Sequence, residues 1–240
     1  MRRALIWIGL LASTGAPLAA NAGGTLFLDR CSAGCAYTPG FDDAGSNTSS
    51  IVPQASNLAA FGHGDESWNA VVACVRDTFA PFDVEVTDVD PGTAPPFEIA
   101  IAGLPTQVGM PNGVTNVAPV TCTGDRVVYD GIGFAFANLL GDAPLEICWN
   151  AAQAAGSLLG LDLELLATDV MTYLNGPLPK AFEDQAAACG ESQARPCRCG
   201  GTTQNSYQWL LTTLPEPGPV AGAAAAIAAL AGLRKRRVAR

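Results

Sequence analysis

The sequence predicts a mixed α/β (α+β) domain that is stapled by disulfides, and three observations support this. Segments with the period-two alternation of strands are interleaved with longer segments of helical periodicity. Apolar residues make up 49% of the chain and charged residues 15%, which is typical of a globular domain. Eight cysteines, an even number, follow a leader that is typical of exported proteins.

The first half of the chain predicts strand, loop, helix, strand and strand. A first strand is expected at residues 25–28 (TLFL), a polar loop at 31–50 and a helix at 67–79 with Ser67 as its N-cap. One face of that helix carries Trp68, Val71, Val72, Val75 and Phe79. Residues 82–89 alternate as a strand with Val84, Val86 and Val89 turned inward, and another strand is expected at 97–102.

The second half predicts two short strands and two helices. The strands are expected at residues 126–129 and 133–138, and a long helix at 145–159. After a segment that is mostly loop, a last helix is expected at 205–211. The order of these elements predicts layers of helix packed on sheet.

The N-terminus has the features of a secretory signal peptide. Arg2 and Arg3 precede an apolar run at 4–11, and an Ala-x-Ala site ends at Ala22. The run is too short to span a bilayer, so we expect signal peptidase to cut between Ala22 and Gly23. The folded domain is therefore expected to span residues 23–213.

The cysteines of an exported chain are expected to form disulfides. They are Cys31, Cys35, Cys74, Cys122, Cys148, Cys189, Cys197 and Cys199. Cys31 and Cys35 are close enough in the sequence to close a local loop. The last three cysteines could crosslink the C-terminal part, but the sequence does not choose a pairing. A thiolate metal site is the alternative, which the lack of a nearby histidine disfavours.

The charge of the domain excludes nucleic acid as a partner. All 22 acidic residues lie between Asp29 and Glu216, against six basic residues there. Phosphates would be repelled by such a surface. A group of acidic residues, Asp83, Glu85, Asp88 and Asp90, indicates either a calcium site or, as is more usual on a strand, a solvated face.

The C-terminal tail, residues 214–240, has three parts. Pro215-Glu216-Pro217 precedes an apolar run at 220–233 and a basic cluster at 234–237. This order resembles the PEP-CTERM sorting signal, which implies processing by an exosortase and a location at the bacterial cell surface or in the extracellular matrix. The alternative is a tail that stays in the membrane as an ordinary transmembrane anchor.

The helix at 145–159 and the residues after it resemble the site of the metzincin zinc peptidases, matrixin-type members in particular. These use H-E-x-x-H-x-x-G-x-x-H followed by a methionine turn, because histidines at i and i+4 share a helix face and the glycine lets the chain turn back. Aligned on Gly160, the motif positions fall on Gln153, Ala154, Ser157, Gly160, Leu163, Met171 and Tyr173. The resemblance spans residues 26–211, including the segment 68–92.

Every catalytic position departs from that motif. Gln153 and Ser157 are poor zinc ligands, and Ala154 and Leu163 offer no ligand or base. The sole histidine, His63, lies far upstream, and we expect it to be solvated. Three carboxylates follow the helix, Asp162, Glu164 and Asp169, and they are expected on the wrong side of the helix end to replace the ligands.

The sequence therefore predicts a pseudopeptidase that binds no zinc. We expect an exported, non-catalytic protein that binds a peptide or polymer in the former substrate cleft, lined by Gln153, Ser157 and Tyr173. Two alternatives remain open. One is a zinc metallopeptidase with an atypical site, and the other is a disulfide-stapled structural domain whose helix and methionine serve only packing.

Overall fold

The computed structural model describes residues 24–92 and 97–214. The predicted signal peptide with its cleavage site at Ala22 and Gly23, and the predicted tail from Pro215 onward with its sorting motif Pro215-Glu216-Pro217, lie outside these residues. Leu214, the first residue assigned to the tail, is instead 2% exposed and packs in the core of the domain. Within the described part of the chain, no helix combines the length and the hydropathy that crossing a membrane requires.

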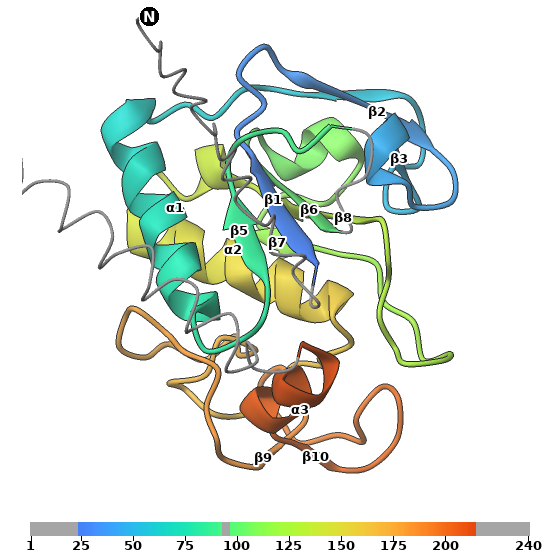
Figure 1. Cartoon of the computed structure of the whole chain (residues 1–240), viewed down its shortest axis with the longest axis vertical. Helices are drawn as coiled ribbons and strands as arrows, with labels where there is room; N and C mark the ends of the chain where they lie inside the picture. The colour runs from blue at the N-terminus through green and yellow to red at the C-terminus, as the bar shows by residue number, and fades with distance from the viewer. Residues whose placement is uncertain (1–23, 93–96, 215–240) are drawn as a thin grey trace, which may run out of the picture.

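A five-stranded mixed sheet forms the centre of the domain (Figure 1), which confirms the predicted mixed α/β class. Its strands are β1 (Thr25–Asp29), β5 (Glu85–Thr87), β6 (Phe97–Ile101), β7 (Asn116–Val117) and β8 (Gly131–Ala135). They lie in the order β5-β1-β6-β8-β7, and only the edge strand β7 runs antiparallel to its neighbour. β6 and β8 are buried along their whole length because both faces of the sheet are covered.

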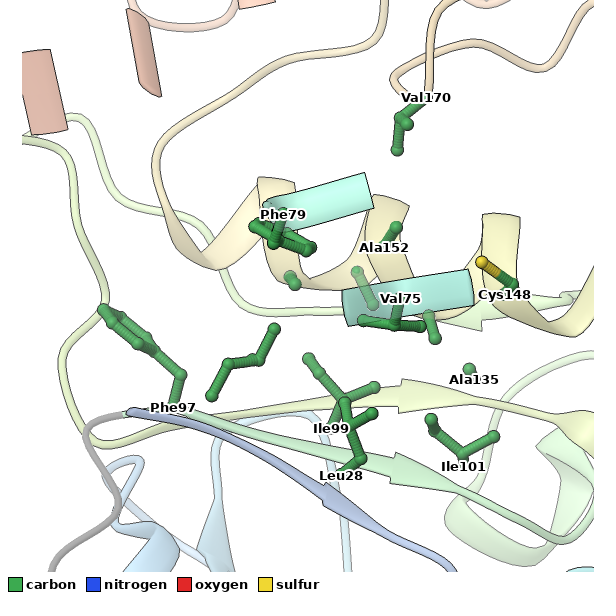
Figure 2. Close-up of a cluster of buried hydrophobic side chains, with 14 of the residues drawn as sticks. Leu28, Val75, Phe79, Phe97, Ile99, Ile101, Ala135, Cys148, Ala152 and Val170 are labelled. Atoms are coloured by element: carbon green, nitrogen blue, oxygen red, sulfur yellow. The ribbon is translucent and has the colours of Figure 1, made fainter. Parts of the chain in front are cut away.

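Two helices cover one face of this sheet, α1 (Gly64–Phe79) and α2 (Pro144–Leu158). Acidic residues in the first turn of each helix stabilise it by interacting with the positive end of the helix dipole, and Pro144 is the first residue of α2. Figure 2 shows the core between the layers, where Val75 of α1 and Ala152 of α2 face Leu28 and Ile99 of the sheet. Burial of this apolar surface fixes α2, and with it the candidate site, on the sheet.

A small three-stranded sheet covers the opposite face. It consists of β2 (Cys35–Pro39), β3 (Thr48–Ser49) and β4 (Ser56–Leu58), in the order β3-β2-β4. Tyr37 and Leu58 pack there with Phe134 and Phe136 in a second buried cluster. The prediction of a plain loop over 31–50 is therefore wrong, because strands of two to five residues are too short to show an alternation.

The C-terminal part folds under the end of α2. Strands β9 (Ala187–Ala188) and β10 (Thr203–Gln204) pair antiparallel, and α3 (Ser206–Thr213) follows. Asn205 caps α3 by accepting a hydrogen bond from the backbone N–H of Gln208. Three short 3-10 turns complete the described elements, η1 (Ala44–Ser46), η2 (Pro105–Val108) and η3 (Ala137–Leu139).

Three local predictions are corrected. Helix α1 begins at Gly64 rather than after Ser67, which is a buried helical residue and not the N-cap. The strand at 82–89 is only β5, and Val89 is 73% exposed rather than turned inward. Residues 126–129 form no strand, because Arg126 takes a positive φ and the backbone of Val128 bonds to the end of α2 instead.

All eight cysteines are paired, as predicted, and this excludes the alternative of a thiolate metal site. The pairs are Cys31–Cys35, Cys74–Cys148, Cys122–Cys199 and Cys189–Cys197. The second pair joins α1 to α2, and the third joins the loop after β7 to the C-terminal segment. Four disulfides indicate an oxidising environment, which agrees with export.

Candidate functional site

The end of helix α2 turns sharply at Gly160. Gly160 has φ +88°, and the N–H of Leu161 donates to the carbonyl of Gly156 at 3.0 Å, which closes the helix end. A Cβ at Gly160 would also lie 2.8 Å from the carbonyl oxygen of Arg126. Glycine is therefore required twice, for the backbone conformation and for the close approach.

Met171 lies fully buried against α2. A Cβ at Gly156 would be 2.5 Å from the Met171 Sδ, so the absence of a side chain at Gly156 leaves the space that Met171 fills. The backbone around Met171 is held by two further bonds, its N–H donating to Asp169 and its carbonyl accepting from the N–H of Glu164. The turn and the helix are thus one packed unit.

Gln153 ties this unit to the edge of the sheet. Its Nε2 donates to the carbonyls of Val170 at 3.0 Å and Thr172 at 2.8 Å, and its Oε1 accepts from Asn116 Nδ2 at 2.8 Å. The side chain is only 2% exposed. Both donors of its amide are used and its oxygen accepts from Asn116, so structural bonds hold this side chain in place.

The structure brings five of the singled-out residues to one cavity of about 120 Å³: Gln153, Ser157, Asp162, Leu163 and Tyr173. Ala154 is not among them. It is fully buried on the sheet side of α2, 3.2 Å from the position of a Cβ on Gly133 of β8. A carboxylate at position 154 would therefore face the sheet rather than this cavity.

A larger cavity of about 400 Å³ adjoins the first and shares Asn116, Gln153 and Tyr173 with it. Trp149 and Asn150 line it from the preceding turn of α2. Sequence reasoning missed both, although residues three and four before Gln153 share its helix face. Asn116 binds Asn150 Oδ1 at 2.7 Å, and the Trp149 indole donates to the carbonyl of Val170.

Asp162 also lines the smaller cavity, so the expectation that it lies on the wrong side of the helix end is wrong, but its carboxylate is held in a saturated network. Its carboxylate accepts from both Arg195 terminal nitrogens, at 2.7 and 2.8 Å, and from the backbone N–H groups of Leu163 and Arg198. Burial alone would raise the pKa of Asp162, but these bonds hold it at about 2. Arg195 also pairs with Glu191.

The other two carboxylates, Glu164 and Asp169, are buried under the turn and line neither cavity. Glu164 accepts from Gln204 Nε2, and Asp169 accepts from the hydroxyl of Ser206. Burial, together with the nearby charge of Asp169, raises the pKa of Glu164 to about 9. Glu164 is therefore a neutral acid at pH 7, holding the turn to the C-terminal segment.

The remaining candidates lie elsewhere. His63 is half-buried rather than solvated, and its Nε2 donates to the carbonyl of Ala137 at 3.0 Å. Asp88 is bound by Arg76 and by the Trp68 indole. Among the described residues, the group predicted for calcium does not bring three ligand atoms within 4.8 Å of one another. The three residues that do so, Asp29, Cys31 and Cys35, include a disulfide pair.

A scan against protein-family models finds no match to this chain, and searches of curated proteins and of solved structures find none either.

Proposed function

We propose that this chain is an exported, non-catalytic protein on a metzincin-like scaffold, and that its cleft holds an extended peptide. The observation that supports the proposal is the pair of adjoining cavities beside edge strand β7. Both are lined by Asn116, Gln153 and Tyr173, so they form one continuous cleft along α2 and the turn after it.

The scaffold part of the proposal is supported by the helix end and the turn. Gly160 reverses the chain, and Met171 packs against α2 at Gly156, which lies directly before Ser157 and three residues after Gln153. This is the arrangement that the resemblance to metzincins implies for the glycine and the methionine. The close approach of Met171 to Gly156 adds to this support, because a side chain at position 156 would occupy the space of the methionine.

The donor set at the motif positions does not fit zinc. The Gln153 amide is used by the turn and by Asn116, Ser157 offers a neutral hydroxyl, and Leu163 offers no ligand. Ala154 is buried against β8 and cannot present a general base to the cavity after a simple exchange. We therefore assign binding, and no hydrolytic step, to this cleft.

A peptide suits the cleft because β7 is the outer strand of the sheet, paired only with β8. An edge strand offers backbone groups to an added extended chain. Trp149 and the half-exposed Tyr173 supply aromatic surfaces for the side chains of such a ligand.

The site of action proposed is the cell surface or the extracellular matrix. The leader ending at Ala22 and the tail beginning at Pro215 support export followed by exosortase processing. The four disulfides are compatible with that route.

The test is retention of an N-acetylated hexapeptide library by the purified protein in equilibrium dialysis, read by mass spectrometry. We expect retained, uncut peptides, and a loss of at least about tenfold in their affinity in Tyr173→Ala. Phe41→Ala is the matched control, because Phe41 is 97% exposed and lines neither cavity. Cleaved peptides would support the atypical peptidase instead, and no retention would leave a structural domain without a cleft function.

A further inference from the structure

The backbone at Arg198 is held unusually firmly for an exposed residue. Both sequence neighbours are in disulfides, Cys197 with Cys189 and Cys199 with Cys122. The Arg198 N–H also donates to the saturated carboxylate of Asp162 at 2.6 Å. Two covalent links to different parts of the chain, together with this bond, fix where the Arg198 side chain begins.

Arg198 lines the smaller cavity, opposite residues of α2. Three polar groups there have no hydrogen-bond or ion-pair partner among the described residues: the guanidinium of Arg198, the hydroxyl of Ser157 and the hydroxyl of Tyr173. All three can donate, and only the hydroxyls can also accept. The cavity thus presents three donors beside the carboxylate of Asp162, whose charge Arg195 neutralises.

The neighbouring carboxylates do not satisfy Arg198. Both Asp162 and Glu191 are bound by Arg195, and the remaining acceptor capacity of Asp162 is used by backbone N–H groups. Like Arg126 and Lys180, Arg198 forms no ion pair with a carboxylate among the described residues, and it differs from them in lining the smaller cavity. The acceptor it lacks can come from a ligand.

We propose that this cavity binds the C-terminal carboxylate of the peptide in the cleft, an inference that rests on the proposed function. A guanidinium matches a carboxylate with two parallel hydrogen bonds, and the hydroxyls of Ser157 and Tyr173 can donate to the same oxygens. In effect, a fixed arginine supplies positive charge beside the motif positions Ser157 and Leu163.

The disulfide Cys122–Cys199 favours the C-terminal carboxylate of the bound peptide as the ligand of this cavity, rather than an acidic side chain within the peptide. Val120 and Arg198 both line the cavity, and this bridge joins the segments that carry them. Beyond this cavity the cleft narrows to a hollow of about 20 Å³, which Val120, Arg198 and Cys199 line. A terminal carboxylate fits the cavity before this narrowing, whereas a continuing chain would have to leave the cleft.

The experiment compares two forms of one randomised, N-acetylated hexapeptide library, with a free carboxylate or a carboxamide at the C-terminus. The two are mixed in equal amounts and dialysed against the full-length protein. We expect the free-acid form to be enriched about tenfold or more over the amide, because charge-assisted bonds are lost in the amide. Arg198→Gln should abolish that enrichment while still retaining peptides weakly.

Arg30→Gln is the matched control, because Arg30 pairs with Asp65 at the surface and lines neither cavity. It should keep the full enrichment. Equal retention of acid and amide by the wild-type protein would overturn the carboxylate site and leave the proposed peptide cleft standing. Retention of neither form would refute both.

Two further probes identify the source of the carboxylate. An amide-capped library with aspartate as its last residue should bind no better than the plain amide, and equal binding of it and the free acid would overturn the terminal assignment. Tetragalacturonate, an acidic oligosaccharide, should show no Arg198-dependent binding. If it alone bound through Arg198, the ligand would be an acidic polysaccharide and not a peptide.

Discussion

The side-chain amide of Gln153 donates to the carbonyl oxygen of Thr172 at 2.8 Å, across the gap between helix α2 and the turn that contains Met171. The residue at the first motif position thus joins two elements of the protein to each other. In the proposed scaffold the same place would hold a metal ligand. We call these hydrogen bonds from Gln153 to the turn the Gln153 clamp. The clamp explains how helix α2 and the turn can keep their relative position with no metal between them.

Replacing Gln153 by alanine should destabilise the protein by about 1–3 kcal/mol, because two carbonyls of the buried turn lose a donor. Ser157→Ala, one turn further along α2, is the control. The Ser157 hydroxyl has no partner within the described chain, so its loss should change the free energy of unfolding by under about 0.5 kcal/mol. Denaturant unfolding measures both, and equal effects would refute the clamp.

The contact between Gly156 and Met171 predicts that the effect of Gly156→Ala on the free energy of unfolding depends on residue 171. Gly156→Ala should destabilise the protein by about 1–3 kcal/mol, because the new Cβ would lie 2.5 Å from the Met171 Sδ. In a Met171→Ala background the same substitution should be neutral or stabilising, because the space is open and alanine favours helix. A double-mutant cycle measures this, and additive effects would contradict the packing.

The pair of Glu164 and Asp169 predicts a pH dependence. The pKa of Glu164 is raised to about 9 from 4.5, so the folded protein keeps a proton that the unfolded chain releases. The free energy of unfolding should therefore fall as pH rises from about 4.5 to about 9. The groups around Glu164 are Asp169, Glu183, Gln204 and Ser206, and none supplies a compensating cation.

Glu164→Gln should reduce this slope without abolishing it below about pH 7, where Glu98, whose pKa burial raises to about 7, also contributes. It should raise the Tm at pH 8 by a few degrees, since about 1 kcal/mol shifts the Tm of a domain of this size by about 2–4 °C. Glu66→Gln is the control, as Glu66 is exposed at the start of α1. Thermal unfolding followed from pH 5 to pH 9 gives the answer. A wild-type stability that rises over this range would show that Glu164 is ionised in the folded state.

The disulfides predict unequal losses of stability. Replacing Cys74 and Cys148 with alanine should cost about 2–5 kcal/mol, because this bridge closes a loop with a sequence separation of 74 and joins α1 to α2. Removing Cys31–Cys35, with a separation of 4, should cost less. Chemical denaturation of both double variants tests the order, and the reverse order would contradict the role of the inter-helix bridge.

Elements with a strong local period could be predicted from the sequence. Helices α1, α2 and α3 and strands β1 and β6 were expected within a few residues of their bounds, because each carries an apolar face or run that burial requires. Gly160 and Met171 are singled out by the resemblance to the metzincin motif, and Met171 does pack against α2 at Gly156.

The rest depends on contacts between distant segments. β7 has two residues, so no pattern marks it, yet it forms the edge of the cleft. The backbone of Arg198 is held at the cavity by the Cys122–Cys199 disulfide and by its bond to Asp162, and spacing along the chain cannot choose such partners. The hydrogen bonds that Gln153 donates to the turn could not be predicted for the same reason. Their acceptors lie 17 and 19 residues further along the chain, in a turn of no regular structure.

The most direct test of the account is the zinc content of the purified protein, measured by elemental analysis after incubation with zinc and exhaustive dialysis. The account predicts far less than one zinc per chain, because Gln153, Ser157 and Leu163 offer no competent ligand set. Carbonic anhydrase, a zinc enzyme treated in the same way, serves as the positive control. Retention of about one zinc per chain would contradict the account. If the protein also cleaved peptides, and a chelator removed both the zinc and the cleavage, the protein would be an atypical metallopeptidase.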